Sequence, residues 1–165
     1  MAALPALTLI MALIATPVLA APSEPSALAI RVLEEVCPSV LKDDFDAVAA
    51  SSEPLGFTNM MGAHFARTPL ADVIFVGSPV RPDMPGCQIS VDFKPAATPD
   101  MVATAEAWAR TKGLKAKGPP ARHTGEDGES YTEATWSGAA GRLLIRVYPP
   151  SAKKRVNVTV EWHAA

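Results

Sequence analysis

Methionine and histidine side chains that can bind a metal lie close together in one short stretch, Met60-Met61-Gly62-Ala63-His64. Thioether and imidazole groups suit copper(I), which an exported protein can meet. However, methionine also fills irregular gaps in hydrophobic cores, and no second Met-x-x-Met or histidine pair follows this stretch. Met60, Met61 and His64 are therefore weak copper candidates, and the sequence predicts no other metal site.

A second set of polar side chains recurs at every second position near the C-terminus. If residues 142–148 and 155–163 form strands, alternate side chains point to one face of a sheet. Charged, amide and aromatic groups then share that face: Arg146, Tyr148, Asn157, Glu161 and His163, with Glu133, Thr135 and Thr159 beside them. A surface that binds a ligand or a partner has this character, and so does an ordinary solvated sheet face. We take the first five residues as a candidate binding face.

Catalytic signatures are missing from the sequence. It contains neither the Gly-x-Ser-x-Gly of a nucleophile elbow nor a Gly-x-Gly-x-x-Gly phosphate loop, so it predicts no catalytic residue and no cofactor. One alternative is a small hydrolase-like enzyme, in which His64 or His163 works with a carboxylate. Its cleft would lie under the segment 56–70.

The stretch from 85 to 113 predicts the elements at the centre of the fold. Residues 87–93 alternate between apolar and polar side chains, which indicates a strand with Cys87, Ile89 and Val91 on its inner face. The sequence Thr-Pro-Asp at 98–100 is typical of a helix start. In the helix that follows, Trp108 is in phase with the apolar positions, so we expect its ring on the sheet near Ile89 and Val91.

The remaining elements are predicted from periodicity and from breaker residues. Residues 26–37 form an amphipathic helix that Pro38 ends or kinks, and a short helix near 44–50 turns Phe45, Val48 and Ala49 inward. The apolar run 72–77 is a strand that is buried on both faces or covered by the segment 56–70, and 131–137, 142–148 and 155–163 form a meander. Residues 56–70 show no period, and 115–130 are an exposed connection. The fold class is therefore α+β: two layers, with a mainly antiparallel sheet of about five strands and two or three helices on one face.

The first 20 residues carry no charged side chain and end in Val-Leu-Ala before Ala21, which is typical of a cleaved signal peptide. Residues 21–165 then form a single domain. An exported chain with two cysteines predicts a Cys37–Cys87 disulfide, because no Cys-x-x-Cys redox motif is present.

The net charge of −2, from 15 basic and 17 acidic residues, gives no basic surface for nucleic acid. No stable membrane span remains once the signal is cleaved. We therefore expect an exported, non-catalytic module of the bacterial periplasm or cell envelope, or one outside the cell, that binds a protein or a small molecule.

Overall fold

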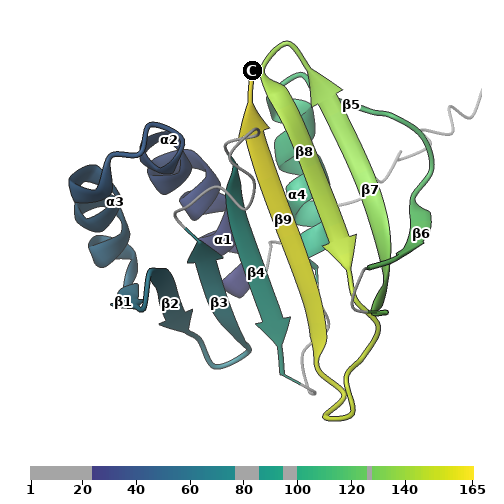
Figure 1. The fold of residues 1–165 in the computed structure, drawn as a ribbon, viewed down its shortest axis with the longest axis horizontal. Coiled ribbons are helices and arrows are strands. Elements are labelled where there is room, and N and C mark those ends of the chain that lie inside the picture. Colours follow the sequence, from purple (N-terminus) through teal and green to yellow (C-terminus); the bar gives the residue numbers. More distant parts are fainter. Residues whose placement is uncertain (1–23, 77–85, 95–99, 126–127) are drawn as a thin grey trace, which may run out of the picture.

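A single antiparallel sheet carries every strand of the protein that the structure describes. The computed structural model describes residues 24–76, 86–94, 100–125 and 128–165. The strand order is β1-β2-β3-β4-β9-β8-β7-β5, and β6 also pairs with β7 (Figure 1). The strands are β1 Thr58–Met60, β2 Ala63–Arg67, β3 Ala71–Val76, β4 Cys87–Phe93, β5 Lys115–Ala116, β6 Ala121–Thr124, β7 Ser130–Gly138, β8 Gly141–Val147 and β9 Val156–Ala164.

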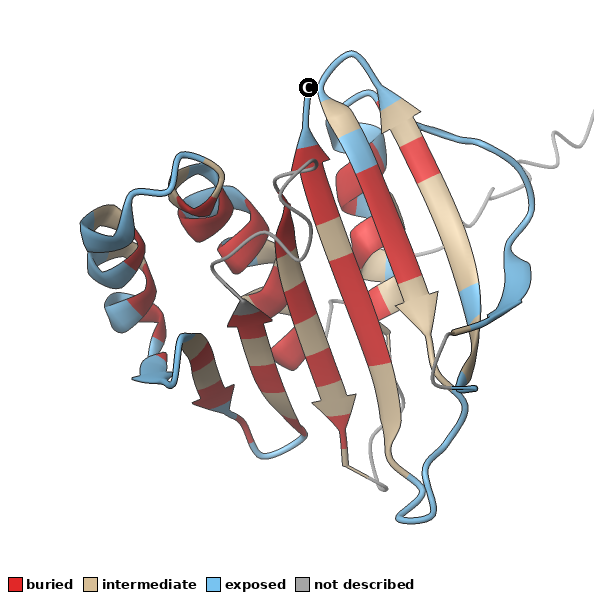
Figure 2. Ribbon diagram, in the orientation of Figure 1, coloured by how far each residue is buried: buried red, intermediate tan, exposed pale blue. Residues whose placement is uncertain are grey.

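Two helices cover one face of this sheet. The first, α1 (Glu24–Arg31), contacts β3 and β4, and α4 (Met101–Thr111) contacts β8 and β9. Both lie behind the strands in Figure 1. Figure 2 shows the resulting alternation of buried and half-buried residues along β2, β3 and β4. The core lies between the helices and the inward side chains of the strands, among them Val73, Phe75, Ile89, Val91, Leu143, Ile145, Val158 and Val160.

The α+β class is confirmed, but the sheet has nine strands, not about five. The five predicted strands are β3, which was predicted from an apolar run, and β4, β7, β8 and β9, which were predicted from alternation. The other four come from the segments predicted as aperiodic or as a connection. Three of them, β1, β5 and β6, are exposed at every residue. Such short strands at an edge need only backbone hydrogen bonds, so they leave no apolar alternation in the sequence.

The N-terminal helical segment continues past the proline that was expected to end it. A π-helical turn at Val32–Val36 follows α1, and α2 (Cys37–Val40) follows that turn. The Cys37 N–H donates to the Val32 carbonyl, one residue further back than in an α-helix. Pro38 then lies in the first turn of α2, where its missing N–H removes no intrahelical bond.

Two further expectations for buried segments were wrong. In α3 (Phe45–Ser52) the Phe45 side chain is 66% exposed and Ala49 is also exposed; only Val48 of the three is buried. A turn of 3₁₀-helix, Glu53–Leu55, follows α3. In β3, Asp72 and Ile74 are half-buried instead of buried, because none of the helices in the described residues covers their side of the sheet.

Trp108 is buried as expected. Its ring lies edge-on to the ring of Trp162 in β9, with 5.3 Å between centroids. Its Nε1–H donates to Glu34 Oε1 at 3.2 Å. Trp162 lies on the strand next to β4, which carries the expected neighbours Ile89 and Val91. The helix phase predicted the buried side correctly, and contact with Ile89 and Val91 stays a prediction.

The disulfide prediction is confirmed. Cys37 and Cys87 are bonded, with 5.5 Å between their Cα atoms, and both are fully buried. The bond joins the N-terminal helical segment to the start of β4, which lies near the middle of the sheet. The predicted signal peptide lies outside the described residues. Within the described part of the chain, no helix is long and apolar enough to cross a membrane.

The two halves of the fold repeat the same arrangement, although the sequence shows no repeat. Each half has a helix on the covered face and a three-stranded meander, β2-β3-β4 in the first half and β7-β8-β9 in the second. The last strands of the two meanders, β4 and β9, pair at the centre. The inward pair Val73 and Phe75 of β3 corresponds to Leu143 and Ile145 of β8. Consequently β4 and β9 occupy the middle of the uncovered face.

Candidate ligand-binding site

The uncovered face of the sheet, called the open face here, carries the predicted binding residues. Strand register aligns Glu133 with Arg146 and Arg146 with Thr159. Two-residue alternation then places Asn157, Glu161 and His163 of β9 on the same face as Arg146. Tyr148 follows β8 directly, and its N–H donates to the Asn157 carbonyl at 3.0 Å. The candidate face of the sequence analysis is thus one continuous surface, and its role in binding stays a prediction.

One chain of ion pairs crosses this face over β7, β8 and β9. Arg146 contacts Glu133 through Nε at 2.9 Å and Glu161 through Nη1 at 3.1 Å. His163 Nε2 lies 2.8 Å from the other oxygen of Glu161. Burial opposes the charge of Arg146, but the hydrogen bond and the charges of both glutamates outweigh it and raise the pKa of Arg146. These side chains therefore fix one another in place across three strands.

A second group of ion pairs lies over β2, β3, β4 and β9, and sequence reasoning did not find it. Arg155 Nη2 contacts Asp72 Oδ2 at 2.7 Å and Asp92 Oδ2 at 2.9 Å. Arg67 also contacts Asp72, at 3.1 Å. The hydrogen bond from Arg155 holds the pKa of the Asp72 carboxyl below its ordinary value, although burial acts in the opposite direction. The available signal was a single carboxylate in each strand, Asp72 in the otherwise apolar β3 and Asp92 at a polar position of the alternating β4.

Three uncharged side chains form a hydrogen-bonded row between the two charged groups. Thr159 Oγ1 donates to Asn157 Oδ1 at 3.1 Å, and Asn157 Nδ2 donates to Ser90 Oγ at 2.7 Å. Asn157 and Thr159 come from β9 and Ser90 from β4, so the row lies at the centre of the sheet. Thr159 is buried and Asn157 is half-buried. Alternation in the sequence predicted Asn157 and Thr159 on this face, but it did not predict Ser90.

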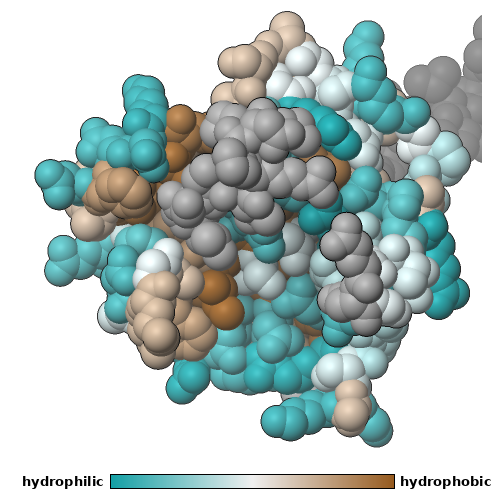
Figure 3. All heavy atoms as spheres, in the orientation of Figure 1, coloured by the Kyte–Doolittle hydropathy of each residue, from teal (hydrophilic) through white to brown (hydrophobic). Residues whose placement is uncertain are grey.

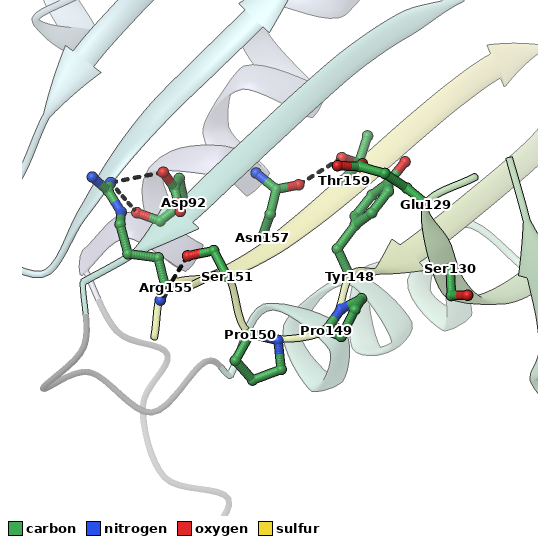
Figure 4. Close-up of a pocket in the computed structure, with 10 residues that line it drawn as sticks. All are labelled: Asp92, Glu129, Ser130, Tyr148, Pro149, Pro150, Ser151, Arg155, Asn157 and Thr159. Carbon is green, nitrogen blue, oxygen red and sulfur yellow. Dashed lines mark hydrogen bonds and ion pairs between the residues drawn. The ribbon is translucent and has the colours of Figure 1, made fainter. Parts of the chain in front are cut away.

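A pocket of about 490 Å³ opens beside this row (Figure 4). Its charged lining residues are Asp92, Arg155 and Glu129. Its uncharged polar lining comes from Ser130, Ser151, Asn157, Thr159 and Tyr148, and Pro149 and Pro150 complete the wall. Figure 3 views the molecule from this side and shows hydrophilic side chains over the lower parts of β4 and β9. A recess of this size with a few convergent polar groups is typical of a small-molecule site.

A second pocket, of about 450 Å³, shares Ser130, Tyr148, Pro149 and Pro150 with the first. Its other lining residues include Val147, Val156 and Tyr131, so it is the more apolar of the two. Of the five predicted binding residues, the first pocket contains Tyr148 and Asn157, and the second contains Tyr148. Arg146, Glu161 and His163 line neither pocket.

The weak copper candidates lie in different environments. His64 is buried in β2, and its ring stacks on Phe75 with centroids 4.4 Å apart. Burial lowers the pKa of His64, and its Nδ1 lies 3.4 Å from the buried Ser52 Oγ. Met60 and Met61, in contrast, are exposed to solvent. Among the described residues, no three His, Cys, Asp or Glu side chains gather as a metal site.

Comparison with known proteins gives no relative from which a function can be transferred. No protein-family model matches the chain, and neither a curated protein nor a solved structure does.

Proposed function

We propose that this protein is an exported, non-catalytic domain that binds a small molecule in the 490 Å³ pocket of the open face. The observation that carries the proposal is the fixed lining of that pocket. Arg155 is held by two aspartates, and Asn157 is held between Thr159 and Ser90. Polar groups that are already in place lose little conformational entropy on binding, which favours affinity for a small ligand.

The sheet also limits the ways in which the site can bind. The strands around the pocket pair with each other, β4 with β9 and β9 with β8. Their backbone groups are therefore used within the sheet and do not accept an added strand from a protein partner at this point. Recognition must come from side chains, which favours a small molecule over an extended peptide.

The Cys37–Cys87 disulfide is consistent with an exported protein, because such bonds persist in oxidising compartments. Together with the charge-free start of the sequence, it supports a place in the bacterial periplasm or cell envelope. A pocket on a disulfide-linked domain can there capture a solute from outside the cell.

A direct test is an NMR screen of the ¹⁵N-labelled, oxidised protein against a library of small polar fragments. We expect binders to shift the amide signals of Asn157, Thr159 and Ser151. Thr159→Val removes one hydroxyl with little change in shape and should weaken those binders. Gln88→Leu is the matched control, because Gln88 is half-buried in β4 beside Glu161 and lines neither pocket. A library that shifts none of the pocket signals would contradict the proposal.

The second candidate function is hydrolase-like catalysis, and the short contact between His163 and Glu161 favours it. A histidine bonded to a carboxylate is a common general base. The pair lies on the open face, but neither residue lines a described pocket, and Glu161 is also bound to Arg146. The test is hydrolysis of ester, phosphoester and glycoside chromogenic substrates. Activity that disappears in His163→Ala and persists in His123→Ala would establish this function in place of the first.

A further inference from the structure

We propose that the ligand of the pocket is a neutral molecule with several hydroxyl groups, a sugar or a sugar-like polyol. This inference rests on the proposed binding function and specifies its ligand class. It follows from three properties of the lining: its charge balance, the direction of its hydrogen bonds, and the position of its apolar surfaces.

The charge balance disfavours an anionic ligand. Arg155 is the positive residue among those that line the pocket, and its guanidinium already contacts Asp72 at 2.7 Å and Asp92 at 2.9 Å. The lining also includes a second carboxylate, Glu129, in addition to Asp92. A carboxylate or phosphate placed here would face these two acids, while the guanidinium is shared between two aspartates. Both aspartates contact Nη2 of Arg155, and its Nε has no partner among the described residues but is buried away from solvent. Bidentate capture of an anion needs two accessible donors on one arginine, and the buried Nε cannot be one of them.

The hydrogen-bonded row requires a ligand that both donates and accepts. Thr159 gives its one hydroxyl proton to Asn157, so its oxygen can only accept from a ligand. Asn157 gives one amide hydrogen to Ser90 and retains the second as a donor. Within the described residues, the row therefore offers an acceptor and a donor side by side. A hydroxyl group matches both, whereas an ammonium group can only donate and a carboxylate can only accept.

The Asp92 carboxylate adds an acceptor that remains accessible. Its side chain is 33% exposed even with Arg155 bound, and Figure 4 shows Asp92 on the same side of the pocket as Arg155. Because Arg155 and Arg67 together balance the charges of Asp72 and Asp92, Asp92 does not require a cationic ligand. An accessible, charge-compensated carboxylate accepts hydrogen bonds from hydroxyl groups.

The apolar part of the wall suits the C–H face of a sugar ring. Tyr148, Pro149 and Pro150 follow one another at the end of β8, and all three line the pocket. In Figure 4 the Tyr148 ring and the two proline rings lie along one side, across from Asp92 and Arg155. A polyol ring has hydroxyl groups around its edge and carbon-bound hydrogens on its faces. It can satisfy the polar and the apolar sides together, as a small-molecule site requires.

The test compares neutral sugars with an anionic and a cationic sugar. The oxidised protein is titrated with glucose, galactose, mannose, maltose and N-acetylglucosamine as neutral probes, with glucuronate as the anion and glucosamine as the cation. We expect at least one neutral sugar to shift the signals of Asn157, Thr159 and Ser151. Glucuronate and glucosamine should each bind about tenfold more weakly than that neutral sugar, which corresponds to about 1.4 kcal/mol.

Two variants then assign the site. Thr159→Val should weaken the neutral sugar about fivefold, the effect of one hydrogen bond of about 1 kcal/mol, and Gln88→Leu should leave its affinity unchanged. If the neutral sugars give no pocket shifts while glucuronate, glucosamine or a fragment does, the sugar class is wrong and the binding function stands. If neither the sugars nor the fragment library shifts these signals, both proposals fail.

Discussion

Arg155, which directly precedes β9, reaches across β4 to Asp72 of β3, and the two side chains meet at 2.7 Å. This ion pair joins the start of β9 to a strand that is not its neighbour in the sheet. Asp92 of β4, the strand between them, contacts the same guanidinium through its carboxylate and through its backbone carbonyl. The pair links the two halves of the fold on the side of the sheet that no described helix covers, and Arg155 and Asp92 also line the pocket.

Asp72→Asn should lower the free energy of unfolding at pH 7 by about 1–3 kcal/mol, because it removes a charge-assisted hydrogen bond. Since the folded protein holds the pKa of Asp72 low, the native state stabilises the charged carboxylate. That stabilisation is complete above the ordinary pKa of about 4 and is lost as the pH falls through the lower, folded-state pKa.

Urea unfolding at pH 7 and at pH 3 measures this effect. Wild type should lose more stability between the two pH values than Asp72→Asn does. Asp43→Asn, at an exposed position with φ of 58° that asparagine tolerates, is the control and should change little at either pH. An equal acid sensitivity of wild type and Asp72→Asn would show that the ion pair does not stabilise the fold.

Removal of the disulfide should destabilise the protein by about 4 kcal/mol on the chain-entropy model, since the bond closes a loop of 50 residues. Both cysteines are buried, so replacement by alanine keeps the site apolar. The measurements are urea unfolding of the double Cys37→Ala/Cys87→Ala variant and intact mass of the exported protein before and after reduction. Two free thiols in unreduced material would refute the bond, and an N-terminus at Ala21 would establish the cleavage site.

Trp108→Ala should destabilise the fold by about 3–5 kcal/mol, the usual effect of emptying a large aromatic site. The ring packs on Trp162, and its N–H bonds Glu34, so the side chain joins α4 to both β9 and the N-terminal helical segment. Trp108→Phe keeps an aromatic ring and loses the hydrogen bond, so its effect should be smaller. Thermal unfolding distinguishes the two. A Trp108→Ala variant with an unchanged melting temperature that loses a binding partner would make this helix face the functional surface instead.

The elements that could be predicted are those whose burial leaves a period in the sequence. In β9 the apolar residues Val156, Val158, Val160 and Trp162 alternate with polar ones, so both the strand and its two faces are evident from the sequence. The exposed strand β6 has no such pattern, because backbone pairing with β7 holds it. Periodicity records burial, and it does not record backbone pairing.

The pocket was only partly predictable for a related reason. Alternation placed Asn157 on the open face, but Asp92 and Ser90 became its neighbours through the pairing of β4 with β9. Strand order joins two segments far apart in the chain, and no local pattern specifies it. Similarly, the helix phase showed that Trp108 is buried, whereas its packing on Trp162 depends on which strands α4 covers.

Gly86 lies against the imidazole of His163. This close approach predicts that Gly86→Ala and Gly118→Ala differ strongly in their effect on stability. A Cβ at position 86 would lie 2.7 Å from His163 Cε1 and 2.9 Å from Nδ1, so the ring would have to move. His163 is buried and its Nε2 lies 2.8 Å from Glu161, so displacement of the ring strains that contact. Gly86→Ala should therefore destabilise the fold by about 1–3 kcal/mol, as overpacking does.

Gly118→Ala is the matched control, since a Cβ there meets no atom within 4 Å. Both variants are compared by urea unfolding, and the His163 ring signals are followed by NMR. Gly86→Ala should lower the free energy of unfolding less in the His163→Ala background than in wild type, because the obstructing ring is gone. If Gly86→Ala matches Gly118→Ala in stability and leaves the His163 signals unmoved, the imidazole does not occupy this position. The Glu161–His163 contact would then not extend the chain of ion pairs through Glu133, Arg146 and Glu161 to the end of β9.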